Sequence, residues 1–129
     1  MEVIESTLKE FGNIFPNAFH VFGSAEFNHL NAAKVDEVFY LIFKDSKHRL
    51  GLVVGILDGI VKSPFSAPIG GFVFLNEEVK IHQIDGAVEA LIQWVEKKRF
   101  NGIEITLPPS IYHPSFIAKQ LNAFYRAGF

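Results

Sequence analysis

The stretch Ser63-Pro64-Phe65-Ser66-Ala67-Pro68-Ile69-Gly70-Gly71-Phe72 separates two apolar runs near the middle of the chain. Its two prolines lack backbone donors and fix φ, so they interrupt ordinary strand pairing. Its adjacent glycines provide backbone without a Cβ, which permits unusual φ values or a close approach by another group. The stretch is therefore typical either of a surface shaped for a ligand or of a bulge that binds nothing.

The length and composition limit the classes of protein that this chain can be. Its 129 residues favour a single domain with its own core. The chain contains 14 phenylalanines and no cysteine, so we expect a Phe-rich core and exclude disulfides and thiolate metal sites. We expect a cytoplasmic protein, because Met1–Glu5 lacks a basic signal-peptide start and no apolar run has the ~20 residues of a membrane span.

Charge and histidine spacing exclude further classes. The formal net charge is −2, and the one basic cluster is Lys97–Arg99, so the usual footprint of a nucleic-acid-binding protein is missing. The five histidines show no H-x-x-x-H or HExxH spacing, so we expect no metal site.

The pattern of apolar residues predicts the secondary structure. Helical spacing predicts helices over Glu2–Phe11, with Gly12-Asn13 as the C-cap, and over Ala25–Ala33. Alternation and turn residues predict strands over Val35–Phe43, Leu50–Leu57, Ile60–Lys62 and Phe72–Leu75, with a hairpin turn at Asp58-Gly59. A helix over Ile81–Arg99, a strand over Ile103–Leu107 and a helix over Ser115–Ala127 follow.

The predicted order is α-α-β-β-β-β-α-β-α, which indicates an α/β (α+β) domain with a mixed sheet. Its front half is an antiparallel meander. Because β-α-β crossovers are right-handed, we expect Phe72–Leu75 and Ile103–Leu107 to lie side by side as parallel strands.

Two segments and this order resemble the acyl-CoA N-acyltransferase (GNAT) superfamily. The closing Leu121-Asn122-Ala123-Phe124-Tyr125-Arg126-Ala127-Gly128-Phe129 is similar to the family's helix ending in Tyr-x-x-x-Gly-Phe. The stretch Ser63–Phe72 is similar to the Ser-Pro-Phe-x-x-Pro-x-Gly-Gly-Phe segment of bacterial GNAT-like proteins with Fem-like tandem halves. The resemblance implies one GNAT-like domain over residues 1–129 that lacks the family's last strands. We therefore expect an incomplete domain or the N-terminal half of a tandem.

The resemblance also implies a transferase that moves an acyl or aminoacyl group to an amine, with acyl-CoA as the cofactor. Two departures lower the expectation of catalysis. The segment Asn76–Ala87, which leads from the strand into the long helix, contains Gln83, Gly86 and Ala87 but not the glycine pair with which the family holds the pyrophosphate. Phe124 stands where the family has its tyrosine, and Tyr125 is one residue away. We expect a non-catalytic or substrate-recognising half, inactive in isolation; the alternative is a small α/β interaction module.

The candidate site residues fall in two segments. Tyr112 and His113 follow the predicted parallel strand, where open α/β sheets place ligands, so they are candidates for a catalytic donor and base. Alternatively, the pair caps the next helix or faces water. By resemblance, Gly70, Gly71 and Phe72 are the cofactor-binding candidates, and Ser63, Phe65 and Ser66 are the substrate-binding ones, for a small-molecule amine or peptide-like substrate.

The last predicted strand indicates which protein partners to expect. With the family's final strands missing, Ile103–Leu107 is expected to present an unpaired sheet edge. We therefore expect a dimer of this chain, or a second GNAT-like half that covers the edge, and no membrane partner.

Overall fold

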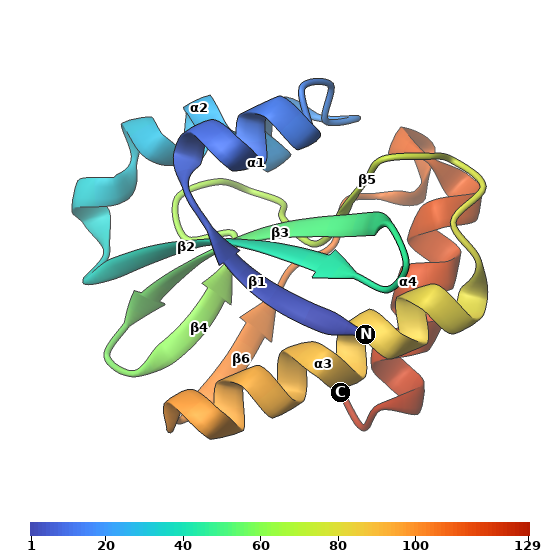
Figure 1. The fold of residues 1–129 in the computed structure, drawn as a ribbon. Helices are drawn as coiled ribbons and strands as arrows, with labels where there is room; N and C mark the ends of the chain where they lie inside the picture. Colours follow the sequence, from blue (N-terminus) through green and yellow to red (C-terminus); the bar gives the residue numbers. More distant parts are fainter.

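The computed structural model describes residues 1–129 as an α/β fold with a mixed, open sheet of six strands and four α-helices (Figure 1). In chain order these are β1 (Glu2–Ser6), α1 (Leu8–Ile14), α2 (Ala25–Leu30), β2 (Glu37–Lys44), β3 (His48–Leu57), β4 (Ile60–Ser63), β5 (Val73–Phe74), α3 (Ile81–Lys98), β6 (Gly102–Ile105) and α4 (Pro114–Arg126). Short 3-10 turns cover Val21–Gly23, Ala32–Lys34 and Ser110–Tyr112.

The sheet has the strand order β1-β2-β3-β4-β6. The short strand β5 pairs with β3 near its N-terminal end, away from the residues that pair with β4. All pairs are antiparallel except β4 with β6. The predicted turn between β3 and β4 is confirmed, since Asp58 and Gly59 have φ values of 52° and 77°. Both values lie in the left-handed region that tight hairpin turns require.

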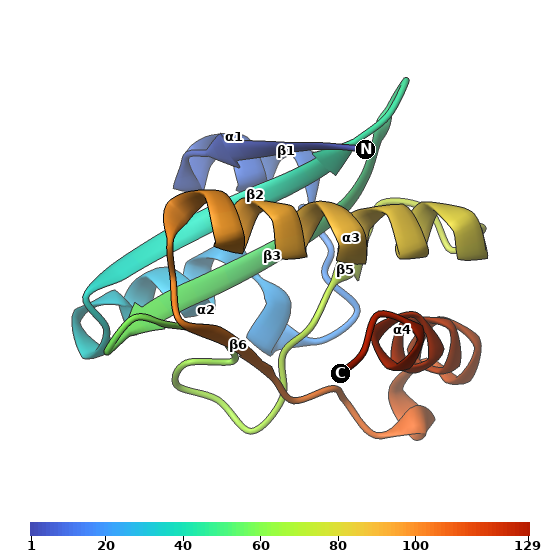
Figure 2. The same cartoon turned by 90° about the horizontal axis from the view of Figure 1, so that it is seen from below.

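Helices cover both faces of the sheet (Figures 1 and 2). Helices α1 and α2 lie on one face, over a cluster that contains Phe11, Phe15 and Tyr40. Helices α3 and α4 lie on the other face, over a larger cluster that contains Phe43 and Leu91. Each strand of the centre is therefore apolar on both sides, as a sheet between two helical layers requires.

The predicted helix over Glu2–Phe11 is wrong. Residues Glu2–Ser6 form β1, which pairs antiparallel with β2, and a helix begins only at Leu8. Thr7 is its N-cap, because the Thr7 side chain accepts a hydrogen bond from the N–H of Glu10. The helix also continues through the predicted C-cap at Gly12-Asn13 and ends at Ile14, with Phe15 as its C-cap.

The predicted parallel pairing of Phe72–Leu75 with Ile103–Leu107 is also wrong, because the parallel partner of the second strand is a different one. Strand β6 pairs with β4, not with the segment after the glycines, of which only Val73–Phe74 forms a strand. β5 instead pairs with Leu50 and Gly51 of β3. The physical reason is that β4 and β5 both lie along β3, and the chain between them leaves the sheet and returns.

The two long helices lie close to their predicted bounds. Helix α3 ends at Lys98, one residue before its predicted end, and Arg99 is its C-cap with a left-handed φ of 62°. Helix α4 begins at Pro114, and the His113 side chain caps it. None of the helices combines the length and apolar character needed to cross a bilayer.

Candidate functional site

The segment between β4 and β5, residues 64–72, leaves the sheet and rejoins it beside β6. The N–H of Thr106 donates to the carbonyl of Ser63 at 2.9 Å, and the N–H of Gly70 donates to the carbonyl of Thr106 at 2.7 Å. The N–H and C=O groups of Thr106 therefore both point toward β4. Gly70 takes the place beside Thr106 that a continuation of β4 would otherwise occupy. We call residues 64–72 the excursion.

The three predicted cofactor-binding residues use their backbone donors within the chain. Besides the bond from Gly70, the N–H of Gly71 donates to Ser63 Oγ at 2.9 Å, and the N–H of Phe72 donates to Gln120 Oε1 at 2.7 Å. All of these groups are buried. An acyl carbonyl at this place would have to displace one of them, so the cofactor role of Gly70, Gly71 and Phe72 stays a prediction.

Packing explains why two glycines and a phenylalanine occur here. A Cβ on Gly70 would lie 2.5 Å from the backbone of Ser63 and Pro64, and Gly71 has a φ of 89°. Such a contact is shorter than van der Waals distance, so no side chain fits at Gly70 without moving the backbone. The ring of Phe72 is fully buried and stacks on Phe124 at 5.7 Å.

The predicted substrate-binding residues hold the excursion on the rest of the chain. Ser63 is 2% exposed and accepts the Gly71 bond. The Phe65 ring covers Gly55, where a Cβ would meet it at 2.6 Å. Ser66 Oγ accepts a hydrogen bond from Lys34 at 2.8 Å and donates one to Asn31 at 3.2 Å. Their role toward a substrate stays a prediction.

Tyr112 and His113 lie between β6 and α4. His113 caps α4, because its Nδ1 accepts the N–H of Phe116 at 3.2 Å, while its Nε2 lies 3.9 Å from the carboxylate of Glu77. Tyr112 is 46% exposed, and its ring lies 6.2 Å from that of the buried His20. The capping alternative thus describes His113. The backbone N–H of Tyr112 donates to the carbonyl of Pro109 at 3.1 Å, and its hydroxyl has no hydrogen-bond partner within the chain.

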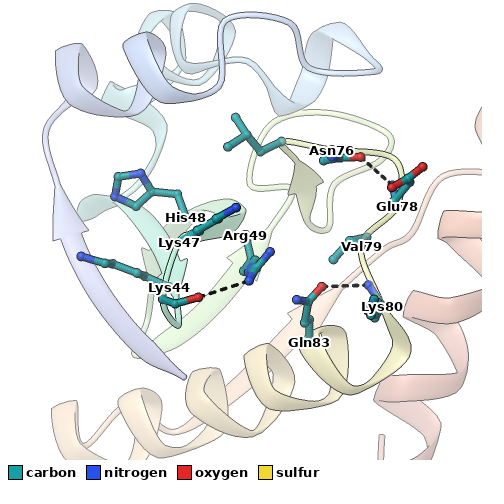
Figure 3. Close-up of a pocket in the computed structure, with 11 residues that line it drawn as sticks. Lys44, Lys47, His48, Arg49, Asn76, Glu78, Val79, Lys80 and Gln83 are labelled. Atoms are coloured by element: carbon teal, nitrogen blue, oxygen red, sulfur yellow. Dashed lines mark hydrogen bonds between the residues drawn. The ribbon is translucent and has the colours of Figure 1, made fainter.

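A pocket of about 640 Å³ opens elsewhere, between the β2–β3 turn and the start of α3 (Figure 3). We call it the basic pocket, because four of its lining residues are cations and one is a carboxylate. Its charged lining residues are Lys44, Lys47, Arg49, Lys80 and Glu78. On a chain with a net charge of −2, this is a local concentration of positive charge.

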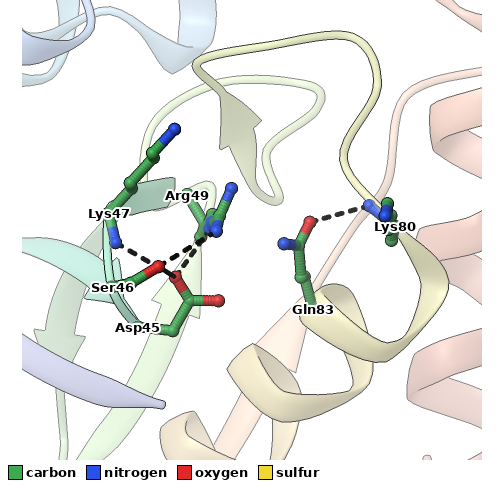
Figure 4. A network of polar contacts seen from close by, with 6 residues as sticks. All are labelled: Asp45, Ser46, Lys47, Arg49, Lys80 and Gln83. Atoms are coloured by element: carbon green, nitrogen blue, oxygen red, sulfur yellow. Dashed lines mark hydrogen bonds and ion pairs between the residues drawn. The ribbon is translucent and has the colours of Figure 1, made fainter.

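The β2–β3 turn orients one side of the basic pocket (Figure 4). The carboxylate of Asp45 accepts hydrogen bonds from Arg49 Nε at 2.7 Å and from the N–H of Lys47 at 3.1 Å. The Arg49 guanidinium lowers the pKa of Asp45 to about 2, so the carboxylate stays ionised. Asp45 therefore fixes the turn and the direction of the Arg49 side chain. The pairing also neutralises part of the positive charge of Arg49.

The N-terminal end of α3 forms the other side of the basic pocket. Gln83 is buried, and its Oε1 accepts the N–H of Lys80 at 2.9 Å. The N–H groups of Ile81 and His82 donate to no acceptor within the chain. In an 18-residue helix such free donors carry the positive end of the helix dipole, which favours an anion.

The arrangement is suited to binding phosphate rather than to proton transfer or nucleophilic attack. Helix N-termini and lysines are the groups that hold phosphates in proteins. Of the acidic residues near the start of α3, Glu78 lines the pocket, whereas Asp85 is bound to Arg126 at 2.6 Å. No group of three or more His, Asp or Glu side chains is placed to bind a metal ion.

Sequence reasoning missed the basic pocket. Its cations come from a polar turn at residues 44–49 and from Lys80, which are more than thirty residues apart, and no single segment is basic. Comparison with protein-family models, curated proteins and solved structures gives no match for this chain.

Proposed function

We propose that this chain is a GNAT-like domain that recognises a phosphate-bearing acyl donor of the coenzyme A type and does not catalyse transfer by itself. Two features support a GNAT-like domain. Two helices precede an antiparallel meander, and a right-handed crossover through α3 then leads to the parallel strand β6. The basic pocket lies at the start of this crossover helix.

The basic pocket is the observation that carries the proposal. It brings the N-terminal end of an 18-residue helix, with Lys80 and Gln83, together with cations from a neighbouring hairpin. Coenzyme A presents a pyrophosphate and a 3′-phosphate, and a pocket of about 640 Å³ has the size of a site for a small organic ligand. The three lysines, together with Arg49 that is already paired with Asp45, would hold the phosphates by charge, where the missing glycine motif would hold them through backbone donors.

The lack of catalysis in this chain is proposed on separate grounds. The N–H groups of Gly70, Gly71 and Phe72 are all bonded within the chain, so no free donor is left there for a carbonyl. Tyr125 is exposed at the end of α4, and Phe124 is buried in the core. We propose that the catalytic groups, which act on a small-molecule amine or peptide-like acceptor, belong to another half or subunit of a cytoplasmic, bacterial-type transferase.

Coenzyme A binding tests the proposal, with affinity measured by isothermal titration calorimetry. The variant Lys47→Gln/Lys80→Gln removes two exposed cations of the basic pocket. A cation near a phosphate contributes about 1 kcal/mol in a solvated site, so we expect a loss of about five-fold per lysine. The matched control Lys9→Gln/Lys97→Gln has the same net charge but changes residues outside the pocket, and it should bind like the wild type.

Pantetheine, which lacks all the phosphates, should not bind measurably. If coenzyme A and pantetheine bind equally, or if both double variants lose the same affinity, the phosphate site is refuted.

A second candidate function, a small α/β interaction module, is favoured by one observation. The edge of β6 that faces away from β4 pairs with no strand, and an apolar groove lies beside it.

A further inference from the structure

Strand β6 leaves one edge of the sheet free. The strand order ends at β6, whose single strand neighbour is β4. Backbone groups of successive residues in a strand point to alternate sides, and those of Thr106 face β4 and the excursion. The N–H and C=O groups of Ile103, Ile105 and Leu107 therefore point away from the sheet. Such a row of unpaired groups is a template for another strand.

The two faces of this edge differ in character. Ile103, Ile105 and Leu107 are half-buried and pack on the larger core cluster, whereas Glu104 and Thr106 are exposed. The apolar face continues into a groove of about 370 Å³ between the strand and the end of α4. Three of its lining residues leave large apolar side chains in solvent: Tyr125 is 78% exposed, Leu121 58% and Phe129 47%.

We infer that this edge pairs antiparallel with the same edge of a second copy of this chain, with Ile105 opposite Ile105. The two-fold symmetry then places Ile103 opposite Leu107 and Glu104 opposite Thr106. Apolar residues meet apolar residues on one face, and a carboxylate meets a hydroxyl on the other. The residues with outward backbone groups form the hydrogen-bonded pairs, which allows about six new backbone hydrogen bonds.

Two other symmetric registers are less favourable. A two-fold axis at Glu104 places two carboxylates directly opposite each other, which is destabilising. An axis at Ile103 sets Gly102 opposite Glu104, and it needs a backbone donor from Asn101, whose N–H already donates to Gly59 at 2.8 Å. Pro108 and Pro109 follow Leu107 and bound the paired segment, since proline lacks a backbone donor.

The absence of cysteine from the chain makes the register directly measurable. Directly opposed residues in an antiparallel pair have Cα atoms about 4.5–5.5 Å apart, which suits a disulfide. Under oxidation, Ile105→Cys should cross-link to itself. Glu104→Cys and Thr106→Cys should each remain uncross-linked alone but should cross-link when mixed. A Lys9→Cys variant, on a surface away from β6, is the control and should stay uncross-linked.

The oligomeric state of the unmodified chain comes first, measured by size-exclusion chromatography with light scattering. We expect a mass of about 29 kDa, twice the 14.5 kDa of one chain, that falls on dilution. Glu104 and Thr106 are exposed, so their variants keep the fold, which far-UV circular dichroism checks. A chain that stays monomeric at every concentration, or a dimer in which Glu104→Cys cross-links to itself, overturns the inference.

Discussion

Replacing Gly70 with alanine tests whether the excursion is a fixed part of the fold. The new Cβ would lie 2.5 Å from the backbone of Pro64 and Ser63, which cannot rotate away as a side chain would. Relieving the contact moves the segment and weakens the 2.7 Å bond from Gly70 to Thr106. A lost hydrogen bond costs about 1 kcal/mol and overpacking about 1–3 kcal/mol, so we expect a destabilisation of about 2–4 kcal/mol.

Gly86 is the matched control, because it accepts the same change without a clash. It lies inside α3, and a Cβ there would be 3.6 Å from Met1, which is an ordinary contact. Alanine is favoured over glycine in a helix by about 1 kcal/mol, so Gly86→Ala should be stabilising by up to that amount.

Urea unfolding measures both variants, followed by the fluorescence of Trp94, the one tryptophan, which is buried on α3. The urea midpoint should fall for Gly70→Ala and rise for Gly86→Ala, with an unchanged m-value. If Gly70→Ala is as stable as the wild type, the excursion does not lie where the structure places it.

Three further predictions concern buried and charged side chains. Ser63→Ala leaves the buried N–H of Gly71 without its acceptor and should cost about 1–3 kcal/mol in the same urea assay, whereas Ser66→Ala should cost less. Burial lowers the pKa of His20 from 6.5, and its ring nitrogens have no partner, so the unfolded chain binds more protons and stability should fall as the pH drops below about 6.5. His20→Leu should remove this pH dependence, seen by comparing urea midpoints at neutral and mildly acidic pH. Arg49 holds the pKa of Asp45 at about 2, so their mutual stabilisation is present above 3.8 and lost as the pH falls toward 2. Arg49→Gln should raise the Asp45 pKa toward 3.8 in an NMR titration; an unchanged value would contradict this.

The sequence predicts the central strands and the two long helices because their signals are local and agree with one another. Both faces of Val38–Phe43 are apolar, Asp58-Gly59 is a strong turn, and Pro114 starts a helix. The first element fails because the spacing of its apolar residues also fits a helix. The Thr7-Leu8-Lys9-Glu10 pattern, an N-cap followed by Glu, could have placed the helix start correctly.

The parallel pair and the basic pocket could not be read from local pattern. The partner of β6 depends on where the excursion rejoins the sheet, which a bond between Gly70 and Thr106 decides across 36 positions of sequence. The cations of the pocket come together only because β2 and β3 bring their turn against the start of α3. Of the predicted site residues, His113 caps α4 and Tyr112 is exposed, whereas the other six make contacts that stabilise the excursion.

The most direct test of the phosphate site is an NMR titration of the labelled chain with coenzyme A, which reports on each backbone amide. The largest chemical-shift changes should fall on two segments, Lys44–Arg49 and Lys80–Gln83, and the amides of Gly70, Gly71 and Phe72 should stay in place. Changes centred on those three amides, or no changes at all, would contradict the basic pocket as the ligand site.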